Sequence, residues 1–506
     1  LGHVAGGRAA IGKLDVLFID AVAEGLRHDA IKERLLEFTP QYLILELTIP
    51  SLKQDKSFCR WCRETLPSTQ ILAGGAIPHS IIRPLLDEGL VDYWIRGEYD
   101  QALVALVDCL VQGHDGHAVA GVVTRDWDSG SRGYVQHVDS LARPPYECLP
   151  MENYRDSVCG LPHPMLQTWF SRGCPFTCSF CVWPQLFYGS RRYRCRDVET
   201  GVREIAELVE RYNLLSFYID DDTANIGKRR LFLLAEKLQE YGLSKLPWAM
   251  MARADCMHED VLEALKESGL YSIKYGVESI DPQLANACDK GTRMDRLYRT
   301  IEQTRELGIK MHLTFTLGIP GETRDTMFRT LEFALNTAPE TAQFSICTPF
   351  PGTRFFDECE RNGWLRHHNW EDYLGDSRAV IDTPWLPAEV LEETYAEICR
   401  CWREFVTNRL EMRREKLIQR LRHLLGQGMQ WVFLGDTEFA AFILEDRQLS
   451  ESRLETEDVQ ELGQRRDVLG VIVSRHDEEK LYRRLINSNS GWTAQRILKL
   501  YSADQS

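Results

Sequence analysis

Strand-like and helix-like segments alternate along most of this 506-residue chain, and this alternation is what most constrains its fold. Short apolar runs of strand length are followed by longer runs with apolar residues at three- and four-residue spacing. Strands that alternate with helices in this way form parallel sheets, in which helices cover the sheet faces. The sequence therefore predicts an α/β protein.

The first block of alternation covers about the first 112 residues. We expect 14–20 to be a buried strand of its sheet, residues 1–12 to end a preceding helix, and 119–138 to form a hairpin. Doubly wound sheets bind ligands at the carboxyl ends of their strands. The block therefore predicts a Rossmann- or flavodoxin-like domain with a cofactor-sized ligand at the sheet edge. Candidate residues at these strand ends are Thr48, Ser51, Gly74, Gly75, Gly97 and Glu98.

The second block, over residues 165–385, contains six strand–helix units. Such a repeat predicts a (β/α)6 partial TIM barrel, whose ligands lie among the loops at the strand carboxyl ends. Polar residues follow several of the expected strands at these ends. The candidates are Asp220, Asp221, Arg253 and Glu278.

Three cysteines, Cys174, Cys178 and Cys181, stand at CX3CX2C spacing after the apolar run 165–170. Thiolates are the usual protein ligands of iron–sulfur clusters. Three cysteines without an obvious fourth nearby leave one iron open for another ligand, whereas a zinc site would require a fourth donor. Some of the 15 cysteines will be close by chance. The spacing nevertheless predicts a [4Fe–4S] cluster.

The cysteine motif with its aromatic Phe180 resembles the radical S-adenosylmethionine (SAM) superfamily, and the first block resembles the cobalamin (B12)-binding domain upstream of many class B radical SAM methylases. The resemblance covers about residues 10–385. It implies that the three cysteines bind the cluster, and that the first-block strand ends bind cobalamin. The residues that it assigns to SAM are Phe180, Asp220, Asp221, Arg253 and Glu278.

Two features depart from this family pattern. The chain reads Gly97-Glu98-Tyr99-Asp100 where the family often reads Gly-Glu-Gly-Glu, and it has no Asp-X-His-X-X-Gly motif to supply a histidine to cobalt. Radical SAM relatives commonly lack that motif. The alternative that the first domain has kept the fold but no longer binds the corrinoid therefore stays open.

The resemblance implies reductive cleavage of SAM to a 5′-deoxyadenosyl radical and methyl transfer from cobalamin to an unactivated carbon. The substrate would be a small molecule, lipid or natural product, and electrons would come from a flavodoxin- or ferredoxin-type donor. One alternative is rearrangement, cyclisation or ring contraction without methyl transfer, with a vestigial B12 domain. Another is a non-enzymatic sensor or carrier that binds a cluster or corrinoid.

Composition limits the binding partners and the cellular compartment that we expect for this protein. The net charge of −15 argues against nucleic acid bound through a basic surface. No apolar run reaches the length of a transmembrane helix. Many cysteines outside a small secreted framework fit a reducing compartment, so we expect a cytoplasmic protein.

We expect four regions along the chain: a cobalamin-binding-type domain at 1–140, with its first strand missing, a linker at 141–164, a radical SAM domain at 165–385, and a C-terminal region at 386–506. The last region reads as a long helix over 387–425 and a small accessory α/β domain with strands near 431–435 and 467–474.

Overall fold

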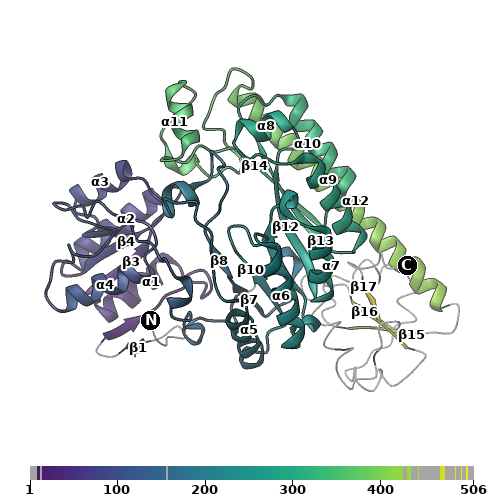
Figure 1. Ribbon diagram of the computed structural model, residues 1–506, viewed down its shortest axis with the longest axis horizontal. Helices are drawn as coiled ribbons and strands as arrows, with labels where there is room; N and C mark the ends of the chain where they lie inside the picture. Colours follow the sequence, from purple (N-terminus) through teal and green to yellow (C-terminus); the bar gives the residue numbers. More distant parts are fainter. Residues whose placement is uncertain are drawn as a thin grey trace.

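The computed structural model describes residues 8–11, 14–154, 156, 158–425, 430–434, 443, 468–472, 485, 492 and 497–499. The described elements form a smaller sheet with helices α1–α4, a central six-stranded sheet with its own helices, and a small third sheet beyond it (Figure 1). The α/β fold with parallel sheets is therefore as predicted.

The first sheet has the order β3-β4-β5-β6, with β3, β4 and β5 parallel and β6 antiparallel. Four helices accompany it. The bounds are β3 (Tyr42–Glu46), β4 (Gln70–Gly74), β5 (Tyr93–Ile95), β6 (Val122–Val123), α1 (His28–Phe38), α2 (Leu52–Thr65), α3 (His79–Asp87) and α4 (Asp100–Val111).

Three expectations for this first block are wrong. Strand β2 (Leu14–Leu17) pairs antiparallel with β1 (Arg8–Ile11), not with the parallel sheet, and 8–11 is a strand and not a helix. A short apolar run indicates extended backbone but does not identify its partner strand. The expected 119–138 hairpin is reduced to β6 and one bridge from Val123 to Asp128. The hydroxyls of Ser129 and Ser131 accept the Gly121 N–H there, so side chains compete with a strand ladder.

The central sheet has six parallel strands in chain order, β14-β13-β12-β11-β10-β7, which confirms the six predicted strands. The strands are β7 (Met165–Thr168), β10 (Ser216–Ile219), β11 (Trp248–Ala252), β12 (Leu270–Glu278), β13 (Lys310–Leu317) and β14 (Thr341–Ile346). The helices are α5 (Val198–Tyr212), α6 (Lys228–Glu240), α7 (Glu259–Glu267), α8 (Pro282–Ala287), α9 (Met294–Glu306), α10 (Arg324–Thr337) and α11 (Arg354–Arg361).

The two faces of this sheet differ, as the two-residue period of a strand requires. On β12 and β13, Ile273, Tyr275 and Leu313 are fully buried against the surrounding helices. The intervening residues, such as Lys274 and Thr314, stay partly accessible on the inner face. The inner face is therefore free to line a chamber.

One apolar core joins the first sheet to the central one. It contains Leu47 and Trp94 from the first sheet together with Cys288, Cys347 and Phe355 from loops and helices of the central unit. Burying such surface contributes about 25 cal/mol per Å2. The two sheets are consequently held in a fixed relation by packing as well as by the polar contacts described below.

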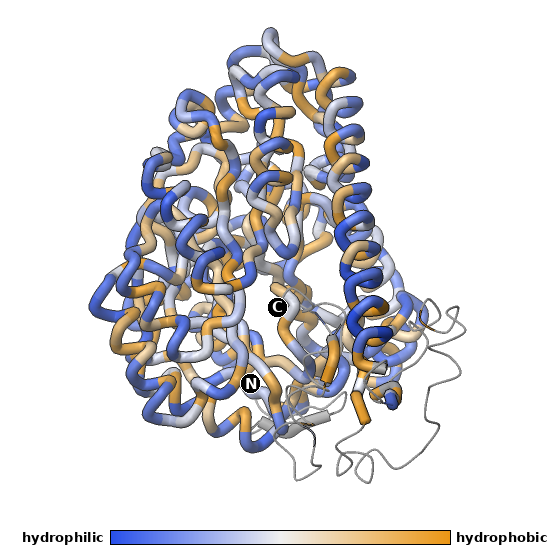
Figure 2. The backbone as a smooth tube through the Cα atoms, turned by 90° about the vertical axis from the view of Figure 1, so that its right-hand side faces the viewer, coloured by the Kyte–Doolittle hydropathy of each residue, from blue (hydrophilic) through white to orange (hydrophobic). Residues whose placement is uncertain are grey.

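The C-terminal helix α12 (Ala388–Leu425) packs beside α10 and the edge strand β14, and runs along one side of the molecule (Figure 2). Beyond it, β15 (Gln430–Phe433), β16 (Val468–Ile472) and β17 (Ile497–Lys499) form a parallel sheet near the two expected strands. Gly435 and the helix expected after it lie outside the described residues. In the described part of the chain, no helix is both long and apolar enough to cross a membrane.

Candidate cluster and cofactor site

The cysteine motif lies in a loop that begins at strand β8 (Ser171–Arg172), which pairs with β9 (Arg194–Cys195). Gly173 has φ +86°, and a Cβ on it would lie 2.3 Å from the Arg192 carbonyl oxygen, so only glycine fits. The Gln185 amide donates to the carbonyl oxygens of Cys178 at 3.2 Å and Cys181 at 2.8 Å. The loop is thus held by the Gly173 turn and by the Gln185 side chain.

The three thiols lie close enough together to affect one another electrostatically. Burial raises the pKa of Cys178, while Lys290 and Arg253 lower it, and burial raises the pKa of Cys181 to about 12. Metal binding replaces such thiol protons. Among the described residues, no three His, Cys, Asp or Glu side chains surround a single ion. Cluster cysteines each bind a different iron, so the donor set fits a cluster better than one ion.

The acidic run after β10 supports the cysteine loop. Asp221 is 2% exposed and accepts hydrogen bonds from the Phe170 N–H at 2.7 Å and the Ser171 hydroxyl. Its oxygens therefore hold the chain ahead of the cysteines, and its contact with SAM stays a prediction. Asp222, the third acid of the run, accepts from the Gly173 N–H at 2.8 Å. Asp220 is exposed and bonded to Gln167.

Arg253 lies after β11 with its guanidinium almost fully buried. It forms a two-pronged pair with Asp255, with both N···O distances 3.1 Å, and donates to the Lys290 carbonyl oxygen at 2.9 Å. Its remaining Nη1 is buried without a partner. A buried unpaired donor of a charged group is costly, so this atom fits an anionic ligand group beside the cysteine loop.

Glu278 ends β12 at a bulge with φ +64°, a conformation that is strained for a residue with a side chain. Its carboxylate accepts from the Thr316 hydroxyl at 2.6 Å and lies 3.4 Å from Lys290 Nζ. The bulge aims the side chain across the strand ends. Glu278 and Arg253 also both influence Cys178, so the structure brings these predicted residues together.

The aromatic side chains of the loop are arranged differently from the expectation. Phe180 packs against the apolar core that joins the two sheets. Phe176 lies under Arg253, with the guanidinium carbon 3.7 Å from the ring centroid. Sequence reasoning passed over Phe176, and only its place inside the cysteine motif could have drawn attention to it.

At the first sheet, Thr48 and Ser51 follow β3 with their hydroxyl oxygens 2.7 Å apart, and Ser51 donates to Asp55 at 2.7 Å. A Cβ on Gly75 would lie 2.2 Å from the Leu47 carbonyl oxygen, and one on Gly74 would lie 3.2 Å from the Tyr99 ring. The glycines at this edge are thus required by the packing of the chain itself.

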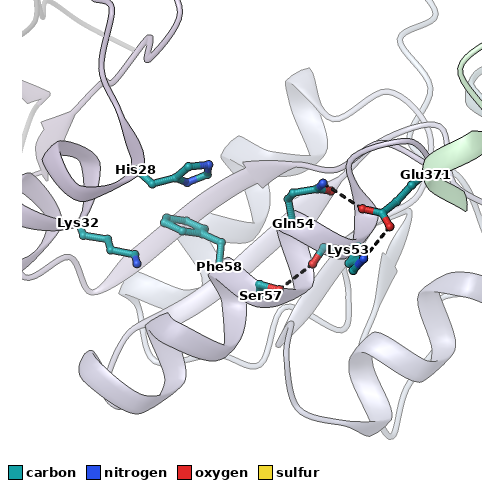
Figure 3. A pocket seen from close by; sticks show the side chains of 7 residues that line it. All are labelled: His28, Lys32, Lys53, Gln54, Ser57, Phe58 and Glu371. Carbon is teal, nitrogen blue, oxygen red and sulfur yellow. Dashed lines mark hydrogen bonds and ion pairs between the residues drawn. The ribbon is translucent and has the colours of Figure 1, made fainter. Parts of the chain in front are cut away.

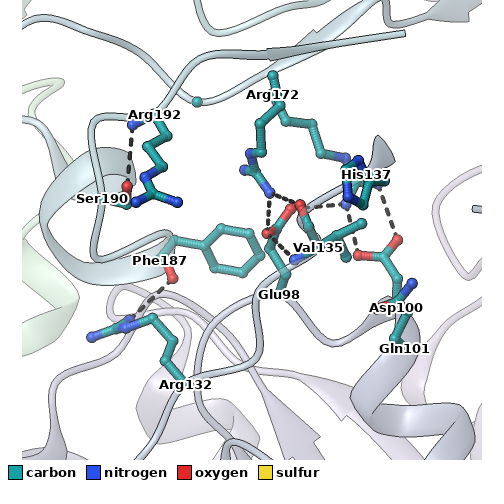
Figure 4. Close-up of polar contacts among 12 residues, drawn as sticks. Glu98, Asp100, Gln101, Arg132, Val135, His137, Arg172, Phe187, Ser190 and Arg192 are labelled. Carbon is teal, nitrogen blue, oxygen red and sulfur yellow. Dashed lines mark hydrogen bonds and ion pairs between the residues drawn. The ribbon is translucent and has the colours of Figure 1, made fainter. Parts of the chain in front are cut away.

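Figure 4 shows Glu98 at the junction between the sheets, beside Arg172. The Glu98 carboxylate is fully buried and accepts from the Val135 N–H at 2.9 Å, Arg172 at 3.1 Å and Arg194 at 2.6 Å. Arg132 and Gly133 fill the space beside Gly97. Both residues are predicted to contact cobalamin; this contact stays a prediction, and the chain itself fills the space beside them.

A hollow of about 320 Å3 lies elsewhere, between α1, α2 and the short helix η7 (Trp370–Asp372) (Figure 3). Glu371 there pairs with Lys53 at 2.7 Å and accepts from Gln54 at 3.1 Å. None of the predicted site residues lines it. Its lining residues are His28, Lys32, Lys53, Gln54, Ser57, Phe58 and Glu371.

Glu322, in the loop after β13, is a buried carboxyl that holds the start of this loop. It is 1% exposed, and one oxygen accepts the N–H groups of Gly318 at 2.5 Å and Ile319 at 3.2 Å. The other oxygen is buried without a partner. Burial raises the pKa of Glu322 to about 7, against the two hydrogen bonds that lower it.

We expect Glu322→Gln to stabilise the protein at pH 8. The raised pKa means that the native state loses stability as pH rises from about 4.5 to about 7, because only the unfolded state ionises freely there. Glutamine does not ionise, so its gain at pH 8 should reach up to about 3 kcal/mol and vanish near pH 4.5. Thermal midpoints across this range measure it, with exposed Glu332→Gln as control. A pH-independent difference would contradict the account.

Comparison with known proteins agrees with this geometry. Residues 170–334 match the family described as the radical SAM superfamily. An uncharacterized methyltransferase of Pyrococcus horikoshii is 28% identical over 71% of this chain and 78% of its own. An anaerobic magnesium-protoporphyrin IX monomethyl ester cyclase of Rubrivivax gelatinosus is 25% identical over 84% of this chain and 77% of its own.

Among solved structures, the radical SAM methyltransferase TsrM from Kitasatospora setae, with cobalamin and a [4Fe–4S] cluster bound, has a TM-score of 0.55. The two chains share 19% identity over 66% of this chain and 68% of that one, which is evidence for a shared fold. The family match and the cysteine loop agree on the same residues. Residues 170–334 therefore form a radical SAM domain, and the chain is an enzyme.

Proposed function

We propose that this enzyme is a cobalamin-dependent methyltransferase that cleaves SAM reductively and methylates an unactivated carbon of a small molecule. One observation carries the proposal: the carboxyl ends of the two sheets meet at the cysteine loop. Glu98 follows β5 and binds Arg172, two residues before Cys174. A Cβ on Gly352 would lie 3.0 Å from Pro78 Cβ, so a second pair of strand-end loops also touches. Ligands of parallel sheets bind at these ends.

The residues present fit a cluster and SAM. Cys174, Cys178 and Cys181 would hold three irons, and Arg253 Nη1 would donate to the SAM carboxylate. Glu278 would accept from the SAM amino group or ribose. The bound cluster supplies the electron that cleaves SAM. The chain itself positions SAM and excludes water, since Arg253 and Asp255 are already buried and paired.

The first sheet fits cobalamin in part. Thr48 and Ser51 place two hydroxyls after β3, and Gly74 and Gly75 follow at the same carboxyl edge of the sheet, at the end of β4. Gly97 and Glu98 are engaged by the chain, so the proposal relies on the first four residues only. Support also comes from the methyltransferase relative, which this chain resembles over 71% of its length, and from the TsrM-like fold.

The regions of the chain follow from this proposal. Residues 1–140 would bind cobalamin, 141–164 would link the two sheets, 165–385 would carry the radical chemistry, and 386–506 would serve substrate recognition or assembly. The further partners would be the substrate and a flavodoxin- or ferredoxin-type electron donor, in the cytoplasm.

Metal analysis tests the proposal. The protein is purified without oxygen, its cluster is reconstituted, hydroxocobalamin is added, and unbound cofactor is removed. We expect one cobalt beside about four irons per chain. Iron without cobalt would overturn cobalamin binding and leave the radical SAM assignment intact.

Cyclisation or rearrangement without methyl transfer is the second candidate. The cyclase of Rubrivivax gelatinosus, which resembles this chain over 84% of its length, favours it. The mass of the product separates the two. A gain of one methylene equivalent supports methylation, and an unchanged carbon count supports rearrangement.

We expect Arg253→Met to weaken SAM binding about 10- to 100-fold, because a charge-assisted hydrogen bond contributes about 1.5–3 kcal/mol. Arg253→Lys keeps the charge and should lose less, although it loses the two-pronged geometry. Anaerobic calorimetry measures the affinity, with exposed Arg229→Met as control. Unchanged binding in both Arg253 variants would contradict this role.

A further inference from the structure

The inner face of the central sheet carries polar side chains at paired positions of neighbouring strands. Lys274 on β12 is the register partner of His312 on β13, and His312 is the partner of Thr341 on β14. The neighbours of Lys274 along the strand, Ile273 and Tyr275, are fully buried on the opposite face. Lys274 and His312 therefore stand side by side on the inner face.

Both side chains hold a polar atom without a partner. Among the described residues, the Lys274 ammonium has no hydrogen bond or ion pair, whereas Lys290, in the loop between α8 and α9, pairs with Glu278 at 3.4 Å. The His312 Nδ1 lies 2.7 Å from the Thr341 hydroxyl, and its Nε2 is buried with no partner. The Gln343 amide approaches this ring without forming a hydrogen bond to Nε2. Polar atoms left unpaired beside each other mark a ligand site.

The charge of the pair is set by burial. Burial first, and Lys274 next, lower the pKa of His312 to about 4, so the imidazole is neutral at neutral pH. If the Thr341 hydroxyl donates to Nδ1, then Nε2 carries the hydrogen and points at the ligand. The site then offers one positive charge and two donors. Asp220 lies on the far side of β11 from Lys274, at the end of β10, and its carboxylate accepts a hydrogen bond from Gln167.

The walls around the pair are apolar. Tyr218, Ala249 and Met251 belong to a small cluster on the inner face, and Leu161 and Cys159 of the segment containing η3 (Val158–Gly160) complete it. Helix η3 packs against β12 and β13. A ligand here meets one polar end and an apolar body.

We propose that Lys274 and His312 bind a carboxylate of the substrate inside this chamber. The inference rests on the proposed radical SAM function, whose cofactor residues end the same strands. Glu278 is four residues beyond Lys274, about 13 Å along a strand, which leaves room for a carbon skeleton between them. A carboxylate matches two donors and one charge, whereas a phosphate dianion would leave charge uncompensated near Asp220.

Site-resolved lysine acylation tests this directly. The full chain with its cluster is acylated anaerobically, and mass spectrometry reports the rate at Lys274 and, as internal control, at Lys56 on α2. Hexanoate is the probe, hexanamide its neutral match, and chloride holds ionic strength constant. At about ten times its dissociation constant, hexanoate should slow acylation of Lys274 about tenfold and leave Lys56 unchanged. His312→Phe, checked for an unchanged thermal midpoint, should weaken the protection.

Three results would overturn the proposal: no protection by hexanoate, equal protection by hexanamide, or stronger protection by inorganic phosphate. The measurement needs neither cobalamin nor turnover. A protein that protects Lys274 but binds no cobalt keeps the carboxylate site and loses the methylation proposal. A protein that binds cobalt but shows no protection of Lys274 keeps the cobalamin proposal and loses the carboxylate site.

Discussion

Replacing Cys178 by serine is expected to abolish SAM cleavage. The side chain lies between its two partner cysteines in the loop and within the electrostatic reach of Lys290, Arg253 and Glu278. A serine hydroxyl replaces the soft thiolate, and its oxygen is a poor ligand for the iron of such clusters. We expect the iron content to fall, the visible cluster absorption to disappear, and 5′-deoxyadenosine production to drop at least about 1,000-fold, the scale of losing a whole catalytic group.

The matched control is Cys109→Ser on α4, a cysteine that is partly buried and belongs to the first sheet. It should keep iron, absorption and SAM cleavage, because it lies outside the cysteine loop. Iron analysis after reconstitution checks both variants. A Cys178→Ser protein with a full complement of iron and normal cleavage would show that the motif is not the cluster site.

Much of the fold was predictable because local signals decide it. Alternating apolar runs and helical runs indicate parallel strands, and the central sheet contains six of them in chain order. The errors occur where the sequence indicates an extended backbone but does not identify the strand with which it pairs. Strand β2 carries the expected apolar residues but pairs with β1, and the expected hairpin after 119 gives way to serine and backbone contacts. Pairing of this kind depends on tertiary context.

The candidate site was predictable where residue chemistry is distinctive. The three cysteines, Arg253 and Glu278 come together as expected, because Arg253 and Glu278 lie at the ends of β11 and β12 and the cysteine loop follows β7. The position of a carboxylate directly after a strand does not show whether it binds a ligand or other groups of the protein. Asp221 and Glu98 both follow strands, yet backbone N–H groups or arginines occupy them. Lys274 lies within a strand, so its place on the inner face emerged only from the register.

Replacing Glu98 by alanine is expected to destabilise the protein by about 3–5 kcal/mol, the cost of breaking a buried ion pair by removing one partner. The change leaves Arg194 buried beside Val135 with no carboxylate, and removes one of the two acidic partners of Arg172. Because Arg172 precedes the cysteine loop and Glu98 follows β5, the junction between the sheets should loosen. A lower thermal midpoint and lower cobalt and iron retention would report this.

Two comparisons separate a local effect at Glu98 from a general loss of charge. Glu98→Gln retains an acceptor for the Val135 N–H and should cost less than alanine, because only the ionic part is lost. Asp87→Ala breaks the exposed pair with Arg83 and should cost at most about 0.5 kcal/mol. If Glu98→Ala cost as little stability as Asp87→Ala, the apolar core shared by the sheets would hold the junction alone. The buried ion pairs of Glu98 would then contribute nothing measurable to stability.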